Sequence, residues 1–250
     1  MKTSSKLIAV AAFLILVSLL VYNYQLKAEY ASGRYKNPYR NFVTLKLKDF
    51  DAVDINSTTA ANVKLVQGPF SVRIDSAALE YVNIKQQGNR LKINADFVRD
   101  FRYNYNPYII VISCPKLSEV TTNAAYIANR KQVIDTMYSG EWNMRQNLVE
   151  GFTQDSLSVH QTYGSAIIFS GNHIRAFNAV TGTDAGSGPK ITILDNNKFQ
   201  SATIDILNKS QLQLNGNSVQ NLKYHLADSA RMITTGAAQT TINNSKPLLK

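Results

Sequence analysis

A local repeat constrains the fold of this chain more than any other feature of its sequence. The stretch LQLNGNSVQNL, residues 212–222, follows the same order of apolar, polar, Gly and Asn positions as IIFSGNHIRAF, residues 167–177. A repeat of this kind means that the chain builds the same local structure more than once. The period of such a repeat indicates the architecture of the fold.

The repeat extends over most of the second half of the chain. Residues 155–174, 200–219 and 220–239 align without gaps, and 175–199 fits between them as one longer unit that carries TGTDAGSGP. The shared columns are Leu157, Ala202 and Leu222; Val159, Ile204 and Tyr224; Ile167, Leu212 and Met232; and Gly171, Gly216 and Gly236.

A period of about 20 residues made of short strands and turns predicts a β-solenoid, in which each coil buries its apolar face only when neighbours stack on it. Leucine-rich repeats share this period but need a Leu-rich consensus that the chain lacks. Gly171 and Gly216, each followed by Asn, are expected to turn corners at positive φ. The side chains expected to point inward are Leu157, Val159, Ile167, Phe169, Ile204, Leu212, Leu214 and Leu222.

The first half of the chain alternates apolar and polar residues with the period of two that half-buried strands require. The expected strands are 42–48, 52–56, 62–67, 70–75, 81–86, 90–95 and 108–113. Gly68 and Pro69 separate two of these strands, and QGN at 87–89 predicts a hairpin. Asp75 or Ser76 is expected to cap a single helical turn in DSAALEYV.

Three stretches resemble a known family: FDAVDINSTTAANVKLVQGPFSVRID, VNIKQQGNRLKIN and IIVISCPKLSEVTTNAAYI. They are similar to the bacterial cell-envelope family of unknown function called putative auto-transporter adhesin, head GIN domain. The resemblance covers about residues 43–240 and implies an exported, often tethered β domain whose later part is a right-handed β-helix. The family offers no established catalytic residues to carry over.

The N-terminal segment is expected to enter a membrane. Residues 7–22, LIAVAAFLILVSLLVY, are uncharged and almost wholly apolar, which nearly suffices to cross a hydrocarbon core of about 30 Å. The best small-residue cleavage site, Leu26-Lys27-Ala28, is weak, so a retained anchor is favoured over a cleaved signal peptide. Basic residues are more numerous after this segment than before it, so charge does not settle its orientation.

The fold class expected from these features is all-β: an N-terminal β-strand region that continues into a right-handed parallel β-helix, preceded by one transmembrane helix. The expected segments are 1–22, a signal anchor; 23–42, a tether without helical or strand periodicity; 43–115, the N-terminal β-strand region; 116–240, the β-helix coils; and 241–250, a C-terminal tail.

Composition adds few constraints on function. The net charge of +10 suits an anionic partner such as phospholipid headgroups or acidic polysaccharide, but singly scattered charges also keep a sheet protein soluble. No basic helix, zinc-ligand set or RNA-binding aromatic signature is present, so no nucleic-acid partner is predicted. Cys114 lies in the apolar run YIIVISCP and is interpreted as a core residue rather than a nucleophile.

The sequence shows no signature of catalysis, of a metal site or of a cofactor. His160, His173 and His225 occupy different coil positions and have no carboxylate at a ligand or general-base spacing. Polysaccharide lyases and hydrolases also use β-helices, so a carbohydrate-active enzyme is the alternative class, but it would need clustered acids on one face. The coil acids fall in different columns; they are Asp155, Asp184, Asp195, Asp205 and Asp228.

One segment carries side chains suited to sugars. RDFRYNYNPY, residues 99–108, places Arg102, Tyr103 and Tyr105 in an Asn-rich link between strands, although these rings could equally pack on the sheet. These three residues are the candidate binding residues. The sequence thus predicts a non-enzymatic binding or structural module, adhesin-like and without cofactor. It would be anchored in the bacterial cell envelope with its β domain in the periplasm or outside, and its candidate partners are envelope polysaccharide and another envelope protein.

Overall fold

The computed structural model of the chain describes residues 3–33, 36–97, 108–138, 147–243 and 246–247. It divides into two compact units, Met1–Phe42 and Val43–Lys250. The fold is mostly β, with one apolar helix near the N-terminus.

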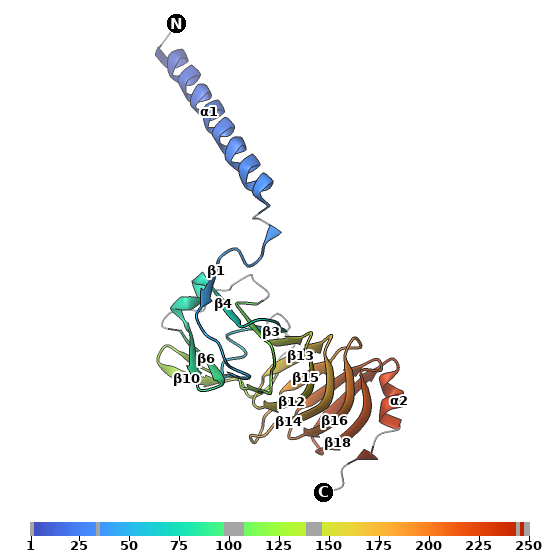
Figure 1. The fold of residues 1–250 in the computed structure, drawn as a ribbon. Coiled ribbons are helices and arrows are strands. Elements are labelled where there is room, and N and C mark those ends of the chain that lie inside the picture. The colour runs from blue at the N-terminus through green and yellow to red at the C-terminus, as the bar shows by residue number, and fades with distance from the viewer. Residues whose placement is uncertain (1–2, 34–35, 98–107, 139–146, 244–245, 248–250) are drawn as a thin grey trace. The chain divides into compact units, whose positions relative to one another are not determined.

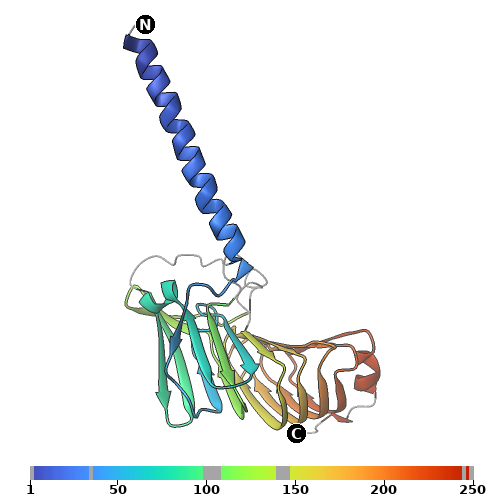
Figure 2. The same cartoon turned by 45° about the horizontal axis from the view of Figure 1, so that its top comes forward.

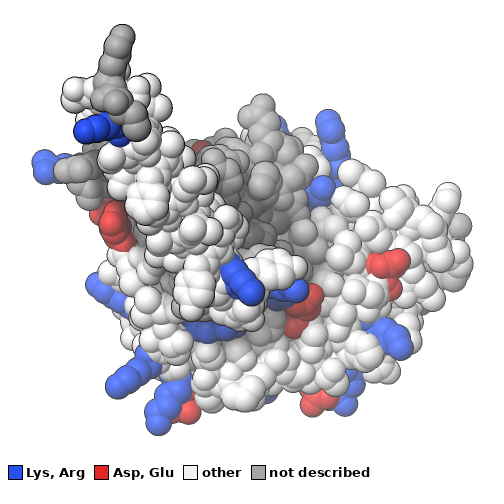
Figure 3. All heavy atoms as spheres, turned by 90° about the horizontal axis from the view of Figure 1, so that it is seen from above, with Lys and Arg blue, Asp and Glu red and all other residues white. Residues whose placement is uncertain are grey.

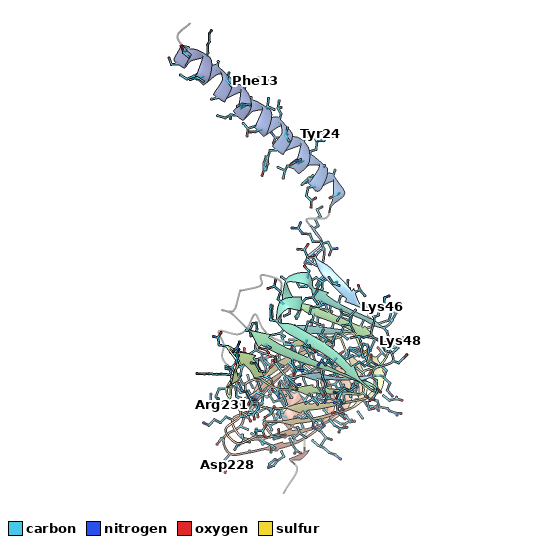
Figure 4. The ribbon with its side chains drawn as sticks, turned by 90° about the vertical axis from the view of Figure 1, so that its left-hand side faces the viewer. Phe13, Tyr24, Lys46, Lys48, Asp228 and Arg231 are labelled. Carbon is cyan, nitrogen blue, oxygen red and sulfur yellow. The ribbon has the colours of Figure 1, made fainter. Side chains whose placement is uncertain are left out.

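Helix α1 spans Thr3–Ser32, and none of its residues is buried. The side chains of Phe13 and Tyr24 stand out from it in Figure 4, 65% and 78% exposed. The expected absence of helical structure after residue 22 is wrong for 23–32. These residues include the helix formers Leu26, Lys27 and Ala28, and the helix ends only before Gly33, whose φ is +66°.

The described strands form two sheets (Figure 1). The first has the order β1-β4-β7-β3-β11-β13-β15-β17-β19. Its strands are β1 Phe42–Leu45, β3 Val63–Gln67, β4 Ser71–Asp75, β7 Ile110–Cys114, β11 Asn147–Glu150, β13 Ala166–Ser170, β15 Lys190–Ile193, β17 Gln211–Asn215 and β19 Arg231–Thr235.

The second sheet has the order β10-β9-β6-β2-β8-β12-β14-β16-β18-β20, and β5 pairs with β6. Its strands are β2 Ala52–Ile55, β5 Val82–Gln87, β6 Arg90–Phe97, β8 Glu119–Thr122, β9 Ala125–Ala128, β10 Lys131–Ile134, β12 Thr153–Gln161, β14 His173–Thr181, β16 Lys198–Ile206, β18 Val219–Leu226 and β20 Lys246–Pro247.

The alternation in the first half of the chain located its strands correctly. β1 to β7 coincide with the seven expected strands to within three residues at each end. β5 and β6 form the expected antiparallel hairpin around Gly88, whose φ is +61°. The expected helical turn is a 3-10 helix, Ser76–Glu80, and the Asp75 carboxylate accepts a hydrogen bond from the backbone N–H of Ala77.

From β11 onward every described strand pair is parallel, and the chain alternates between the two sheets. Figure 2 shows these strands following one another from yellow to red. The registers confirm the aligned columns: Val159 pairs with Ala179, Ala179 with Ile204, and Ile204 with Tyr224. Ile167, Ile191, Leu212 and Met232 form the corresponding row in the other sheet. The unit at 175–199 therefore adds one more rung to the stack.

Two regions depart from a uniform series of parallel coils. Within 116–240, β9 and β10 form an antiparallel hairpin, with Val133 opposite Tyr126. At the other end, 220–239 does not end as a third complete repeat, because helix α2 begins at Ala238 and runs to Asn243. The expected tail contains β20, which pairs with β18. Ala238 is buried and Ile242 packs against the core, so α2 covers apolar side chains after the final rung.

The larger of two hydrophobic clusters among the described residues extends from Phe50 to Ala238 and joins the two halves of the β unit. All eight side chains that were expected to point inward are buried, with at most 3% of each exposed. Phe177 stacks on Phe199 with a centroid distance of 4.9 Å and meets Phe169 edge to face at 5.1 Å. These rings come from both sheets, so their contacts stabilise the packing of one sheet against the other.

Buried asparagines turn the corner between the two sheets. The Oδ1 atom of Asn172 accepts from the N–H of Phe152, and the Oδ1 atom of Asn197 accepts from the N–H of Asn172, each at 3.0 Å. Both side chains also donate to backbone carbonyls of the preceding rung, Val149 and Phe169. Gly171 and Gly216 take the expected positive φ, +64° and +60°, immediately before this corner.

Candidate functional site

The alternation of inward and outward side chains is interrupted shortly after the long strands β12, β14 and β16 begin, which indicates a bend in each strand. In each of them two successive residues face away from the core: Asp155 and Ser156, Arg175 and Ala176, Gln200 and Ser201. The ladder skips the first residue of each pair, since Ser156 is registered with Ala176 and Ala176 with Ser201. The backbone groups at the skipped position therefore need other partners.

Side chains of the following rung bond to two of the skipped carbonyl groups. The hydroxyl of Ser201 donates to the carbonyl oxygen of Arg175 at 2.9 Å, and the amide of Asn221 donates to that of Gln200 at 3.0 Å. The bend is thus fixed from rung to rung by hydrogen bonds that do not use the side chains of Arg175 or Gln200. Those two side chains stay free of this structural role.

The bend lies beside an open groove of about 650 Å³ at the N-terminal ends of the three strands. The segment before β8 adds Pro115 and Lys116 to the lining, next to β12 in the sheet. The charged and amide side chains that line the groove are Lys116, Gln154, Asp155, His173, Arg175, Lys198 and Gln200. All of them except the half-buried Gln154 are exposed, so the groove is a surface feature and not an enclosed cavity.

The charge of this groove, hereafter the basic groove, is positive. Three permanent cations, Lys116, Arg175 and Lys198, face one carboxylate, Asp155, among its described lining residues. The Nη2 atom of Arg175 lies 3.4 Å from the Oδ1 atom of Asp155, but these side chains are 67% and 78% exposed, so water and salt screen the pair. The face shown in Figure 3 has its basic side chains dispersed and interspersed with acids.

A second charged cluster joins three strands of the same sheet. Nη1 of Arg90 donates to Oδ1 of Asp54 at 2.5 Å, and Nη2 donates to Oε2 of Glu119 at 2.7 Å. The hydrogen bond from Arg90 lowers the pKa of Glu119, and burial opposes this effect only in part. The same two carboxylates raise the pKa of Arg90. A general acid in glycoside hydrolysis needs a raised carboxyl pKa, and the pKa of Glu119 is lowered, so Glu119 does not suit that role.

The lowered pKa of Glu119 predicts an acid-sensitive contribution to stability. A carboxyl whose pKa is lower in the folded state stabilises the fold above its unfolded pKa, about 4.3, and loses that contribution as the pH falls through the folded value. We expect Glu119→Gln to be less stable than the wild type by about 1 kcal/mol at neutral pH, with the difference shrinking below about pH 4. Denaturant unfolding across pH measures this, and Asp228→Asn at an exposed corner should change the stability at neutral pH by less than about 0.5 kcal/mol.

The structure also shows the surroundings of Cys114 and of the three histidines. Cys114 is fully buried, and burial raises the pKa of its thiol to about 12, which confirms a core residue and not a nucleophile. His160 and His173 are exposed. His225 differs from the expectation, because its Nδ1 atom lies 3.9 Å from Oδ1 of Asp205 on the adjacent rung. Parallel stacking creates this proximity between residues that are twenty positions apart in sequence.

The sequence-predicted binding residues Arg102, Tyr103 and Tyr105 lie outside the described residues, so their role stays a prediction. The residues of the basic groove were not identified from the sequence. A signal was present, because the alternation of β12, β14 and β16 is interrupted by two outward residues at the same place in each repeat. That interruption marks a bend in a stacked sheet.

Comparison with protein-family models and with curated proteins finds no match. Among solved structures, the chain is similar to a putative adhesin from Bacteroides fragilis, with 13% identity over 84% of this chain and 96% of that chain, and a TM-score of 0.44. It is also similar to a putative adhesin from Parabacteroides merdae, with 14% identity over 82% and 94% and a TM-score of 0.28.

A third similar structure is a putative lipid binding protein from Parabacteroides distasonis, with 13% identity over 83% of this chain and 96% of that chain, and a TM-score of 0.34. Two of these names agree with the adhesin family that the sequence resembles. All three TM-scores are below 0.5, so these likenesses carry no argument about what this chain binds.

Proposed function

We propose that this chain is a non-enzymatic binding module held in the bacterial cell envelope by α1. The observation that carries the proposal is the surface of α1, which is apolar for most of its length and contains no buried residue. Among the described helices, α1 is long and apolar enough to cross a membrane. Exposed apolar surface of this extent is costly in water and is favourable in a bilayer.

The β unit would then be a rigid scaffold outside the cytoplasm. We infer that residues 147–235 form a parallel β-helix, since each coil contributes one strand to each sheet and every rung pairs with the next. A right-handed course is the expected one, because crossover connections between parallel strands are right-handed in almost all proteins. Such a stack presents a fixed surface at little entropic cost on binding.

The pairing of charges supports a binding role over catalysis. Asp54 and Glu119 are both bonded to Arg90, and the thiol of Cys114 is buried. The two carboxylates and the thiol therefore have structural roles in the sheet and its core. The basic groove is lined instead by exposed polar side chains, among them Arg175, Lys198 and Gln200, and it is open to solvent.

Anchoring is tested on the native protein. We expect the full chain to stay in the membrane fraction after an alkaline wash and to keep its N-terminus, and a variant without residues 3–22 to become soluble. Protease should digest the β unit in spheroplasts but not in intact cells. A mature N-terminus at Glu29 would contradict the anchor, and release of reducing ends from a polysaccharide by the purified chain would contradict the non-enzymatic role.

A further inference from the structure

The basic groove crosses neighbouring chain segments and does not lie within one loop. The segment before β8, then β12, β14 and β16 follow one another in the sheet, and each contributes to the lining. Adjacent strands are about 4.8 Å apart, so the distance from the first segment to the last is about 14 Å. A ligand that contacts the whole groove must therefore be extended.

The cations of the groove are arranged along this direction. His173 is registered with Lys198 on the next rung, and Arg175 lies two residues further along β14. Lys116 adds a positive charge beside β12. Lys116, Arg175 and Lys198 thus come from three of the four neighbouring segments, and cations spread in this way match a polymer that carries a negative charge on repeating units, rather than a single small anion.

Arg175 is the side chain best placed for a carboxylate. A guanidinium can bind a carboxylate through two parallel hydrogen bonds, and the contact with Asp155 is long and exposed. Incoming carboxylates would compete with Asp155 for this group. The amide of Gln200 and the hydroxyl of Thr153 lie in the same lining and can bond to sugar hydroxyls.

We propose that the basic groove binds an acidic polysaccharide, with Arg175 and Lys198 contacting its carboxylates. The proposal rests on the proposed function and names the ligand class of that binding module. A hollow lined by cations suits a chain that can enter it, whereas the flat headgroup surface of a bilayer contacts protruding side chains. Affinity comes from several weak, salt-sensitive contacts along the polymer.

The test uses the full chain in phosphatidylcholine nanodiscs and two forms of one polymer, polygalacturonate and its carboxyl-reduced derivative. Binding is measured by interferometry at low and high salt. We expect binding to polygalacturonate that weakens as salt rises, and little binding to the reduced polymer. Arg175→Gln with Lys198→Gln should weaken binding roughly tenfold.

A matched double variant removes the same charge elsewhere. Lys46 and Lys48 are exposed and follow β1, outside the groove lining (Figure 4), so Lys46→Gln with Lys48→Gln should leave binding almost unchanged. Asp155→Asn should strengthen binding about two- to fivefold, because it removes the carboxylate that competes for Arg175. A purely structural role for Asp155 would not produce a gain, and thermal unfolding verifies that each variant is folded.

Equal weakening by both double variants, equal binding of both polymers, or no binding of polygalacturonate would overturn the proposal. Groove-dependent binding to phosphatidylglycerol vesicles but not to the polymer would assign the groove to a membrane surface and overturn it too. In each of these cases the proposed function is retained if the chain stays in the membrane and does not cleave the polymer. Release from the membrane or cleavage of the polymer would instead contradict the proposed function.

Discussion

Replacing Phe177 by alanine is expected to lower the free energy of unfolding by about 3 to 5 kcal/mol. The ring is fully buried, stacks on Phe199 and meets Phe169 from the opposite sheet edge to face. The truncation removes these contacts and leaves a cavity that the closely stacked rungs can fill only in part. Thermal and denaturant unfolding of the full chain in detergent measure the loss.

A matched control distinguishes packing from a general effect of losing an aromatic ring. Phe70 lies outside the buried core and is 38% exposed, although its ring also contacts an aromatic neighbour, Phe50. Phe70→Ala should therefore cost clearly less than Phe177→Ala. Similar losses for both variants would contradict the placement of Phe177 at the centre of the core.

Replacing Asn197 by alanine is expected to cost about 2 to 4 kcal/mol, although the substitution removes little apolar surface. Its Oδ1 atom accepts from both the backbone N–H and the side-chain amide of Asn172, and its Nδ2 atom donates to the carbonyls of Phe169 and Leu194. Alanine would leave the buried N–H of Asn172 without a partner at the corner between the sheets. An unpaired buried donor is costly because no water can replace the lost acceptor.

The preceding residue offers the control for this variant. Asn196 also bonds across the rungs, since its Oδ1 atom accepts from the N–H of Gly171, but its side chain is exposed. Water can take over that bond, so Asn196→Ala should cost less than about 1 kcal/mol. A larger loss for Asn196→Ala than for Asn197→Ala would contradict the role of the buried corner.

Several features of the fold were determined by the sequence alone. The alternation of apolar residues located β1 to β7, and the shared columns located the rungs, down to the pairing of Ile204 with Tyr224. Gly171 and Gly216 predicted the corner, because glycine tolerates positive φ. These features are local or repeat at a fixed period, and local conformational preference together with the need to bury one face of each strand is enough to specify them.

The tertiary structure decided which distant residues meet. Arg90 bridges Asp54 and Glu119 because β2 lies between β6 and β8, and β11 joins the first half through β3. The basic groove exists because three strands bend at the same level and align Thr153, His173 and Lys198 across the rungs. Strand order and bends depend on how the whole sheet packs over its core, and spacing along the chain does not encode them. The groove residues can therefore be read in the sequence, but only the fold shows that they share one surface.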